Sequence, residues 1–191
     1  MTKYVTKSLH KFQHPTPKRA QYAPHQWTHP NYGATKQLAN PLDTSPPIPE
    51  GKKRRIQKII GTFLYYARDV ECTMLPALNT LTEQQSSPTK NTEYAITHFL
   101  DYAATNPSAI IQYKASDMIL HIDSDTSYLS EPRAHSRTGR HHYLSSLPTD
   151  PKKIPNLPPP ENGPIHMECR ILKHMVTSAA EAEVGGLFHN G

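Results

Sequence analysis

The spacing of the apolar residues changes once along this chain, near Pro107, and that change limits the folds open to it. Before Pro107, apolar residues recur at intervals of three and four, which is typical of helices that bury one face. The pattern predicts helices over residues 52–104. The residues that form these helical stripes are Ile56, Ile59, Ile60, Phe63, Leu64 and Ala67, then Leu75, Leu78 and Leu81, then Tyr94, Ile96, Phe99 and Leu100.

After Pro107 the pattern becomes one of alternation. Apolar side chains at 165, 167, 169 and 171 alternate with polar ones, which predicts a half-buried strand. Two more strands are expected, one over 118–122 after an apolar run that starts at Ile110, Ile111 and Tyr113, and one that ends at Tyr143 and Leu144. The expected fold is therefore α/β in the α+β sense. Helices come first, then an antiparallel three-stranded sheet over about 110–176, with a short helix from about 179 packed on it.

Two acidic residues, Asp123 and Asp125, directly follow the first of these strands. As turn residues they would simply close the strand. Because they are two residues apart, they share one face of the strand, so either of them, Asp123 in place of Asp125 if the register differs, could serve as a metal ligand. Both readings remain open at this level.

The segment 178–183 has the pattern of a helix start. Ser178 and Glu181 have the spacing of a capping box, in which the hydroxyl and the carboxylate accept hydrogen bonds from free amides. Glu183 lies about 200° around the helix from Glu181, so the two carboxylates cannot serve one site. Glu181 is expected to have the structural task, and Glu183 is expected to point inward.

Residues 13–50 have no sustained apolar period, and prolines interrupt them repeatedly, which predicts an extended segment. The whole chain has 19 prolines, 36% hydrophobic residues and a mean hydropathy of −0.67, which favours long irregular stretches. His25 and His29 flank Trp27, but no cysteine or acid close by supports a metal site there.

Short segments along the chain match, in order, the motifs of one known family. Residues 60–67 read Ile-Gly-Thr-Phe-Leu-Tyr-Tyr-Ala, residues 124–128 Ser-Asp-Thr-Ser-Tyr, residues 136–139 Ser-Arg-Thr-Gly, and residues 178–183 Ser-Ala-Ala-Glu-Ala-Glu. Together with 4–12 and 94–102, they resemble the end of the reverse transcriptase and the first half of the ribonuclease H domain in copia-type retrotransposon Pol polyproteins. The resemblance implies three parts. Residues 1–50 would be an extended segment after the polymerase thumb, 51–106 a helical connection, and 107–191 an incomplete ribonuclease H-like domain.

This resemblance also implies a chemistry, which is cleavage of RNA in RNA–DNA hybrids by two magnesium ions held between carboxylates. Asp125 and Glu183 match the first two catalytic acids of the family, with Asp123 in reserve as a ligand. The family takes its next catalytic aspartate from a strand after this helix, and no residue follows Gly191. Arg140 also departs from the family, which tends to have a small residue there. The expectation is a fragment that holds magnesium weakly and cleaves RNA inefficiently.

The charge of the chain favours an anionic partner, with nucleic acid the most common one. The net charge is +5 and the isoelectric point about 9.1. Lys52, Lys53, Arg54 and Arg55 form a run at the start of a predicted helix, where the helix dipole disfavours cations. An outside phosphate or a nuclear-import signal would explain that placement, and so would an ordinary solvated basic turn.

The compartment expected for the chain is cytoplasmic or nuclear. It has no secretory signal and no apolar run near the about 18 residues that a membrane span needs. Cys72 and Cys169 lie far apart without metal-ligand spacing, which favours free thiols in a reducing compartment.

Three functional hypotheses follow. The chain is a piece of a reverse transcriptase/ribonuclease H polyprotein whose partners are an RNA–DNA hybrid and the remaining Pol polyprotein. Alternatively, it is a non-catalytic basic remnant that binds nucleic acid or another partner. The third hypothesis is a degenerate reading frame without function.

Overall fold

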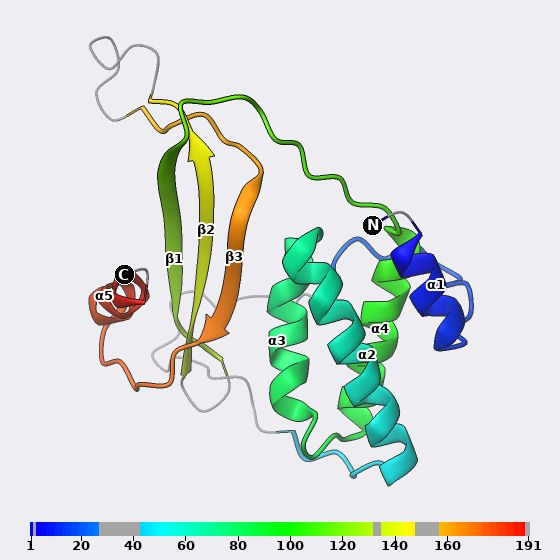
Figure 1. Cartoon of the computed structure of the whole chain (residues 1–191). Coiled ribbons are helices and arrows are strands. Elements are labelled where there is room, and N and C mark those ends of the chain that lie inside the picture. The colour runs from blue at the N-terminus through cyan, green and yellow to red at the C-terminus, as the bar shows by residue number, and fades with distance from the viewer. Residues whose placement is uncertain (2, 27–42, 132–134, 148–156, 190–191) are drawn as a thin grey trace. The chain divides into compact units, whose positions relative to one another are not determined.

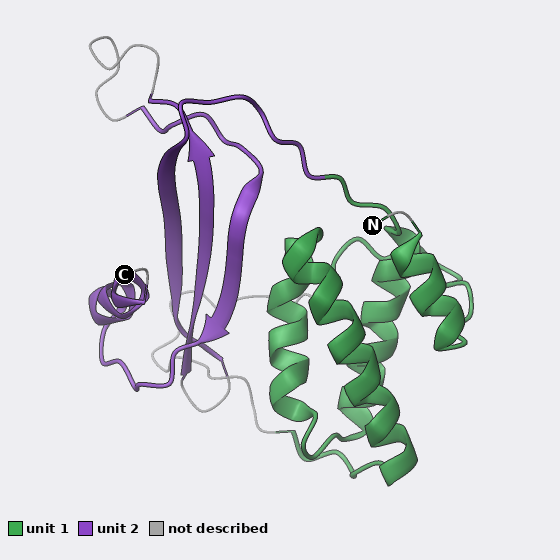
Figure 2. Cartoon of the chain, in the orientation of Figure 1, with its two compact units in different colours: residues 1–110 green, residues 111–191 purple. Residues whose placement is uncertain are grey.

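The structure is a computed structural model that describes residues 1, 3–26, 43–131, 135–147 and 157–189. It divides into two compact units, Met1–Ile110 (unit 1) and Ile111–Gly191 (unit 2), which Figure 2 shows in different colours. Trp27 and His29, and much of the proline-rich connection after residue 147, lie outside the described residues. No helix among the described residues is long and apolar enough to cross a membrane.

Unit 1 is helical, as the apolar spacing predicted for residues 52–104, but the helix at Tyr4–Lys11 corrects the expectation that residues 1–50 are extended throughout. Its elements are α1 (Tyr4–Lys11), α2 (Glu50–Asp69), the short 3-10 helix η1 (Cys72–Met74), α3 (Leu75–Gln84) and α4 (Lys90–Thr105), all shown in Figure 1. The apolar face of α2 is buried except at the half-buried Leu64, and Phe63 meets Phe99 of α4 edge to face with ring centroids 5.2 Å apart. Burial of this apolar face stabilises the helices more than their intrinsic propensity does.

The segment before α2 is irregular, in agreement with the prediction for the proline-rich region. The described residues of 13–49 contain no helix or strand beyond an isolated bridge between Pro47 and Thr89. At the start of α4, Thr89 forms a capping box with Thr92, each side chain accepting from the other's backbone amide. This cap fixes the start of α4 at Lys90.

Unit 2 contains an antiparallel three-stranded sheet in the order β1 (Ile119–Glu131), β2 (His135–Ser145), β3 (Pro164–Ile171). The alternating pattern at 165–171 is confirmed as a strand. The expectation that the first strand ends at Asp123 and Asp125 was wrong. Backbone pairing continues through Asp123↔His141 and Asp125↔Gly139, so both acids lie within the strand. Residues 123–127 are polar, but hydrogen bonding to β2 along their length keeps them in strand conformation.

The sheet begins at Ile119 and not at about residue 110 as expected, because the apolar run at Ile110, Ile111 and Tyr113 is not a strand. Ile110 and Tyr113 are largely exposed. The backbone at Lys114 is bonded by a side chain instead, because Asn162 accepts from the Lys114 amide at 2.7 Å and donates to its carbonyl at 2.9 Å. This segment crosses Gly163 so closely that a Cβ there would lie 2.8 Å from the Gln112 carbonyl oxygen. A side chain therefore supplies the bonds that a neighbouring strand would supply.

The predicted terminal helix is confirmed as α5 (Ala179–Phe188), and it packs on the sheet. Ser178 caps it by accepting from the Glu181 amide at 3.1 Å. The Glu181 carboxylate accepts from the amide and hydroxyl of Thr177, both at 2.7 Å, which is one residue earlier than a regular capping box. These bonds hold the pKa of Glu181 below its usual value. Glu181 therefore has the structural task assigned to it.

Candidate functional site

Asp123 and Asp125 lie on one face of β1, and both are exposed. Asp125 is opposite Gly139, where an added Cβ would meet nothing within 4 Å. The surface beside Asp125 is therefore open. Asp123 is opposite His141, on the same open face.

The surroundings of Asp123 are aromatic rather than acidic. Tyr143 is only 1% exposed, and its ring stacks with His141 at 4.7 Å and with His121 at 5.5 Å between centroids. Burial, and then the negative charge of Asp123 and a hydrogen bond with it, raise the pKa of Tyr143. Asp123 thus interacts with a phenol that stays protonated, and that phenol offers no ligand to a magnesium ion.

Glu183 does not lie where the sequence predicted. In α5 the buried residues are Ala182 and Gly186, one turn apart, and they face the sheet. Glu183 is about 100° around the helix from Ala182 and is exposed, so the expectation that it points inward was wrong. The close contact of Gly186 is with Thr126, the neighbour of Asp125 along β1. Because successive strand residues alternate, α5 covers the face of β1 opposite to the one that carries Asp125.

The described residues therefore do not assemble a metal centre. They contain no group of three or more histidines, cysteines, aspartates or glutamates that could hold an ion. Asp123 and Asp125 share a face, but Glu183 belongs to a separate surface. A pair of exposed carboxylates can take part in weak magnesium binding, with water in the other positions, but cannot clamp two ions.

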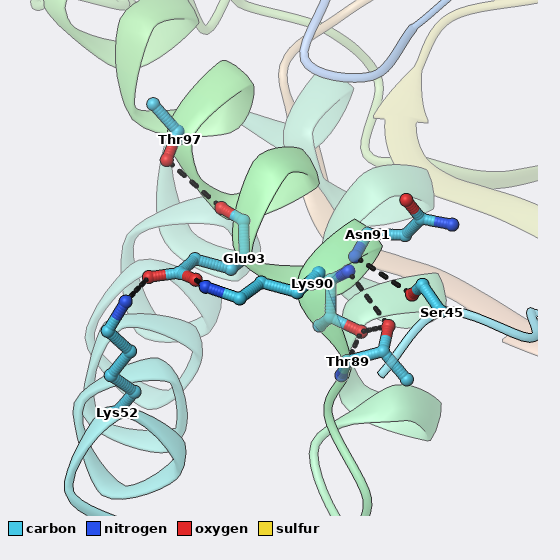
Figure 3. Close-up of polar contacts among 8 residues, drawn as sticks. Ser45, Lys52, Thr89, Lys90, Asn91, Glu93 and Thr97 are labelled. Carbon is cyan, nitrogen blue, oxygen red and sulfur yellow. Dashed lines mark hydrogen bonds and ion pairs between the residues drawn. The ribbon is translucent and has the colours of Figure 1, made fainter. Parts of the chain in front are cut away.

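The basic run at the start of α2 is largely engaged within unit 1. Figure 3 shows Lys52 reaching the Glu93 carboxylate on α4, which Lys90 also contacts at 3.3 Å. Lys53 lies 3.9 Å from Glu50, and Arg55 donates to the Phe12 carbonyl at 2.6 Å.

Arg54 is more exposed to solvent than Lys52 or Lys53. Its side chain is 73% exposed and lies 3.5 Å from Glu50. The cost of cations at this helix start is thus offset by internal acceptors, and no outside anion is needed to explain it.

A cluster of charged groups beneath α5 was not predicted from the sequence. Arg140 is 7% exposed, donates to the His189 carbonyl and lies 3.2 Å from Glu168, which lies 3.3 Å from Arg170. Strand pairing places His142 beside His166 on the same face. The only signal in the sequence was that Arg140 replaces a small residue of the resembled family. We call Arg140, Glu168, Arg170, His142, His166 and His189 the α5 charge cluster.

We expect unit 2 to lose stability as the pH falls below about 6.5. Burial, followed by His166 and Arg140, lowers the pKa of His142, and Glu168 opposes this only in part. Burial, followed by Arg170 and Arg140, also lowers the pKa of His189. Because these two histidines bind protons more readily in the unfolded chain, their contribution to the stability of unit 2 is fully present only above their pKa in the unfolded chain. It is lost as the pH falls through that value toward the folded pKa.

The measurement is the urea midpoint of the sheet amides, followed by NMR, at about pH 7.5 and about pH 5.5. The substitution His142→Gln should reduce the difference between the two midpoints. His10→Gln, at an exposed position of α1, should leave it unchanged. Equal midpoints at both pH values would contradict this account of the α5 charge cluster.

Comparison with known proteins finds no match for this chain among protein-family models, curated proteins or solved structures.

Proposed function

We propose that the chain derives from the reverse transcriptase/ribonuclease H region of a copia-type retrotransposon polyprotein, and that it binds nucleic acid without cleaving it efficiently. The observation that carries the ancestry is the order of its elements. A helical unit is followed by an antiparallel sheet with Asp125 in its first strand, and then by a Ser178-capped helix with Glu183. That order agrees with the one implied by the motif resemblance.

The dispersal of the acids supports the loss of cleavage. Two-metal hydrolysis needs several carboxylates around one pair of ions, and magnesium demands nearly octahedral oxygen ligands. Asp125 and Glu183 lie on separate surfaces, and a catalytic group displaced by about 1 Å already costs on the order of a hundredfold in rate. The ancestral role in cutting RNA–DNA hybrids is therefore not the activity that this arrangement favours.

The net charge of +5 supports binding, because cations that contact phosphates release counterions. We expect weak, salt-sensitive binding to an RNA–DNA hybrid and to single strands, with little sequence preference. Fluorescence anisotropy titrations at about 50 and 200 mM salt test this directly. If no form of nucleic acid binds at the lower salt concentration, the proposed function fails.

Cleavage by the purified chain is expected to stay at background. In millimolar magnesium, a labelled RNA–DNA hybrid should remain intact, and calorimetry should find magnesium binding at millimolar strength or weaker. The variants Asp125→Asn and Glu183→Gln should behave like the unmodified chain. Magnesium-dependent cleavage that disappears in Asp125→Asn would show instead that a nuclease site does assemble.

A further inference from the structure

The outer face of α2 carries a stripe of cations around one exposed tyrosine. Steps of four, three, four and three residues along a helix keep side chains on one side of it. The residues at these positions, all exposed, are Arg54, Lys58, Gly61, Tyr65 and Arg68. A Cβ at Gly61 would meet nothing within 4 Å, so the surface between the cations is open. We call Arg54, Lys58, Tyr65 and Arg68 the α2 stripe.

Two of the three cations of the α2 stripe have no partner among the described residues, and the third has only an exposed one. Within the described part of the chain, the side chains of Lys58 and Arg68 make no hydrogen bond or ion pair. Among the residues that the structure describes, Arg54 pairs only with Glu50, and both side chains are mostly exposed, at 73% and 62%. Such an exposed pair contributes little and exchanges readily for another anion. This separates the stripe from Lys52 and Arg55, which are held by partners on other elements.

Tyr65 is 59% exposed, and its ring is supported from one side. Its centroid lies 6.0 Å from that of Tyr4, whose hydroxyl donates to the Thr62 carbonyl at 3.0 Å and whose ring stacks on Tyr66 at 5.5 Å. A supported ring with an open face is suited to stack on a nucleic-acid base. Two acids, Glu50 and Asp69, lie at the ends of α2, and no acid lies between Lys58 and Tyr65.

Helix α1 adds more positive charge beside α2. Tyr4 contacts the Thr62–Tyr66 end of α2, and the Phe12 carbonyl contacts Arg55, so α1 runs antiparallel along it. Lys7 and Lys11 of α1 are exposed. The surface around the stripe is therefore basic on more than one helix.

We propose that the α2 stripe binds single-stranded nucleic acid, with Arg54, Lys58 and Arg68 on phosphates and Tyr65 stacked on an unpaired base. This rests on the proposed function, because it names the surface through which that binding takes place. The stripe extends over fourteen residue steps, from 54 to 68, or about 21 Å at about 1.5 Å per step. That length is enough for several nucleotides of an extended single strand. A paired base would not expose its face to Tyr65, so a single strand fits better than a duplex.

The test is anisotropy titration of the full chain with a labelled oligothymidylate of about 15 nucleotides. The triple variant Arg54→Gln/Lys58→Gln/Arg68→Gln should lower affinity at least about tenfold and reduce the salt slope by about 2, since each single-strand phosphate contact contributes about 0.7. A matched control, Arg19→Gln/Lys114→Gln/Lys173→Gln, removes the same charge from exposed positions elsewhere and should keep the slope. Tyr65→Leu should weaken single-strand binding about tenfold and leave duplex binding unchanged.

The outcomes separate this inference from the function on which it rests. If the unmodified chain binds and both triple variants lose affinity equally, binding stands and the α2 stripe is not its site. If Tyr65→Leu has no effect on either substrate, the single-strand assignment is overturned. If the unmodified chain binds nothing, the proposed function and this inference fail together. Circular dichroism of each variant is the control that its helices remain folded.

Discussion

Replacing Phe63 with alanine is expected to lower the free energy of unfolding of unit 1 by about 3–5 kcal/mol. Phe63 is fully buried in α2, and its ring meets that of Phe99 edge to face. The substitution removes the apolar contact and leaves a cavity between α2 and α4. A loss of this size is a large share of the about 5–15 kcal/mol that stabilises a typical domain. Urea unfolding followed by circular dichroism at the helix band measures it.

A matched control is Tyr94→Ala on α4. Tyr94 is also aromatic and helical, but it is 61% exposed. Its removal should change the free energy of unfolding by less than about 0.5 kcal/mol. If both substitutions cost the same, the helices of unit 1 are not held together by the Phe63 contact.

Alanine substitutions at two neighbouring glycines of α5 are expected to change the stability of α5 in opposite directions. A Cβ at Gly186 would lie 2.3 Å from the Thr126 hydroxyl oxygen and 3.2 Å from that of Thr138, so the helix or the strand must move. Overpacking of this kind costs about 1–3 kcal/mol. A Cβ at Gly185 meets only Leu172 at 3.5 Å, an ordinary contact. Gly185→Ala should therefore stabilise α5 by about 0.5–1 kcal/mol through helix propensity alone.

Hydrogen exchange of the α5 amides measures both effects, with faster exchange expected for Gly186→Ala and slower exchange for Gly185→Ala. The substitution Thr126→Ala removes the oxygen that a Cβ at Gly186 would meet. In that background, Gly186→Ala should cost much less, which attributes the effect to this contact. Equal protection in the two single variants would mean that α5 does not lie on β1 through Gly186.

Local pattern was enough to predict helices α2, α3 and α4 of unit 1 and the strand β3, but it did not predict α1. The stripe from Ile56 to Ala67 and the alternation at 165–171 each report which side of a short element is buried, and that information lies within a few residues. The cap at Ser178 is equally local, because its partner is the amide of Glu181.

The extent of β1 was not predictable in this way. Residues 123–127 are polar on both faces, so they carry no alternation, and their strand conformation depends on pairing with β2. The apolar run at Ile110 and Ile111 led to the opposite error, a sheet predicted to begin there, because a strand also needs a neighbouring backbone to pair with. Asn162, 48 residues away from Lys114, supplies the bonds instead.

By itself, the sequence determined the classes of element, their order and the positive charge of the chain. Only the tertiary structure decided what the charged groups do. Lys52 is bound by Glu93, 41 residues away, whereas Lys58 in the same helix faces outward. Asp125 and Glu183 belong to separate surfaces because Gly186 brings α5 against Thr126 on the other face of β1. The physical reason is that electrostatic and packing interactions depend on the distance between groups in space, whereas a sequence pattern contains only their distance along the chain.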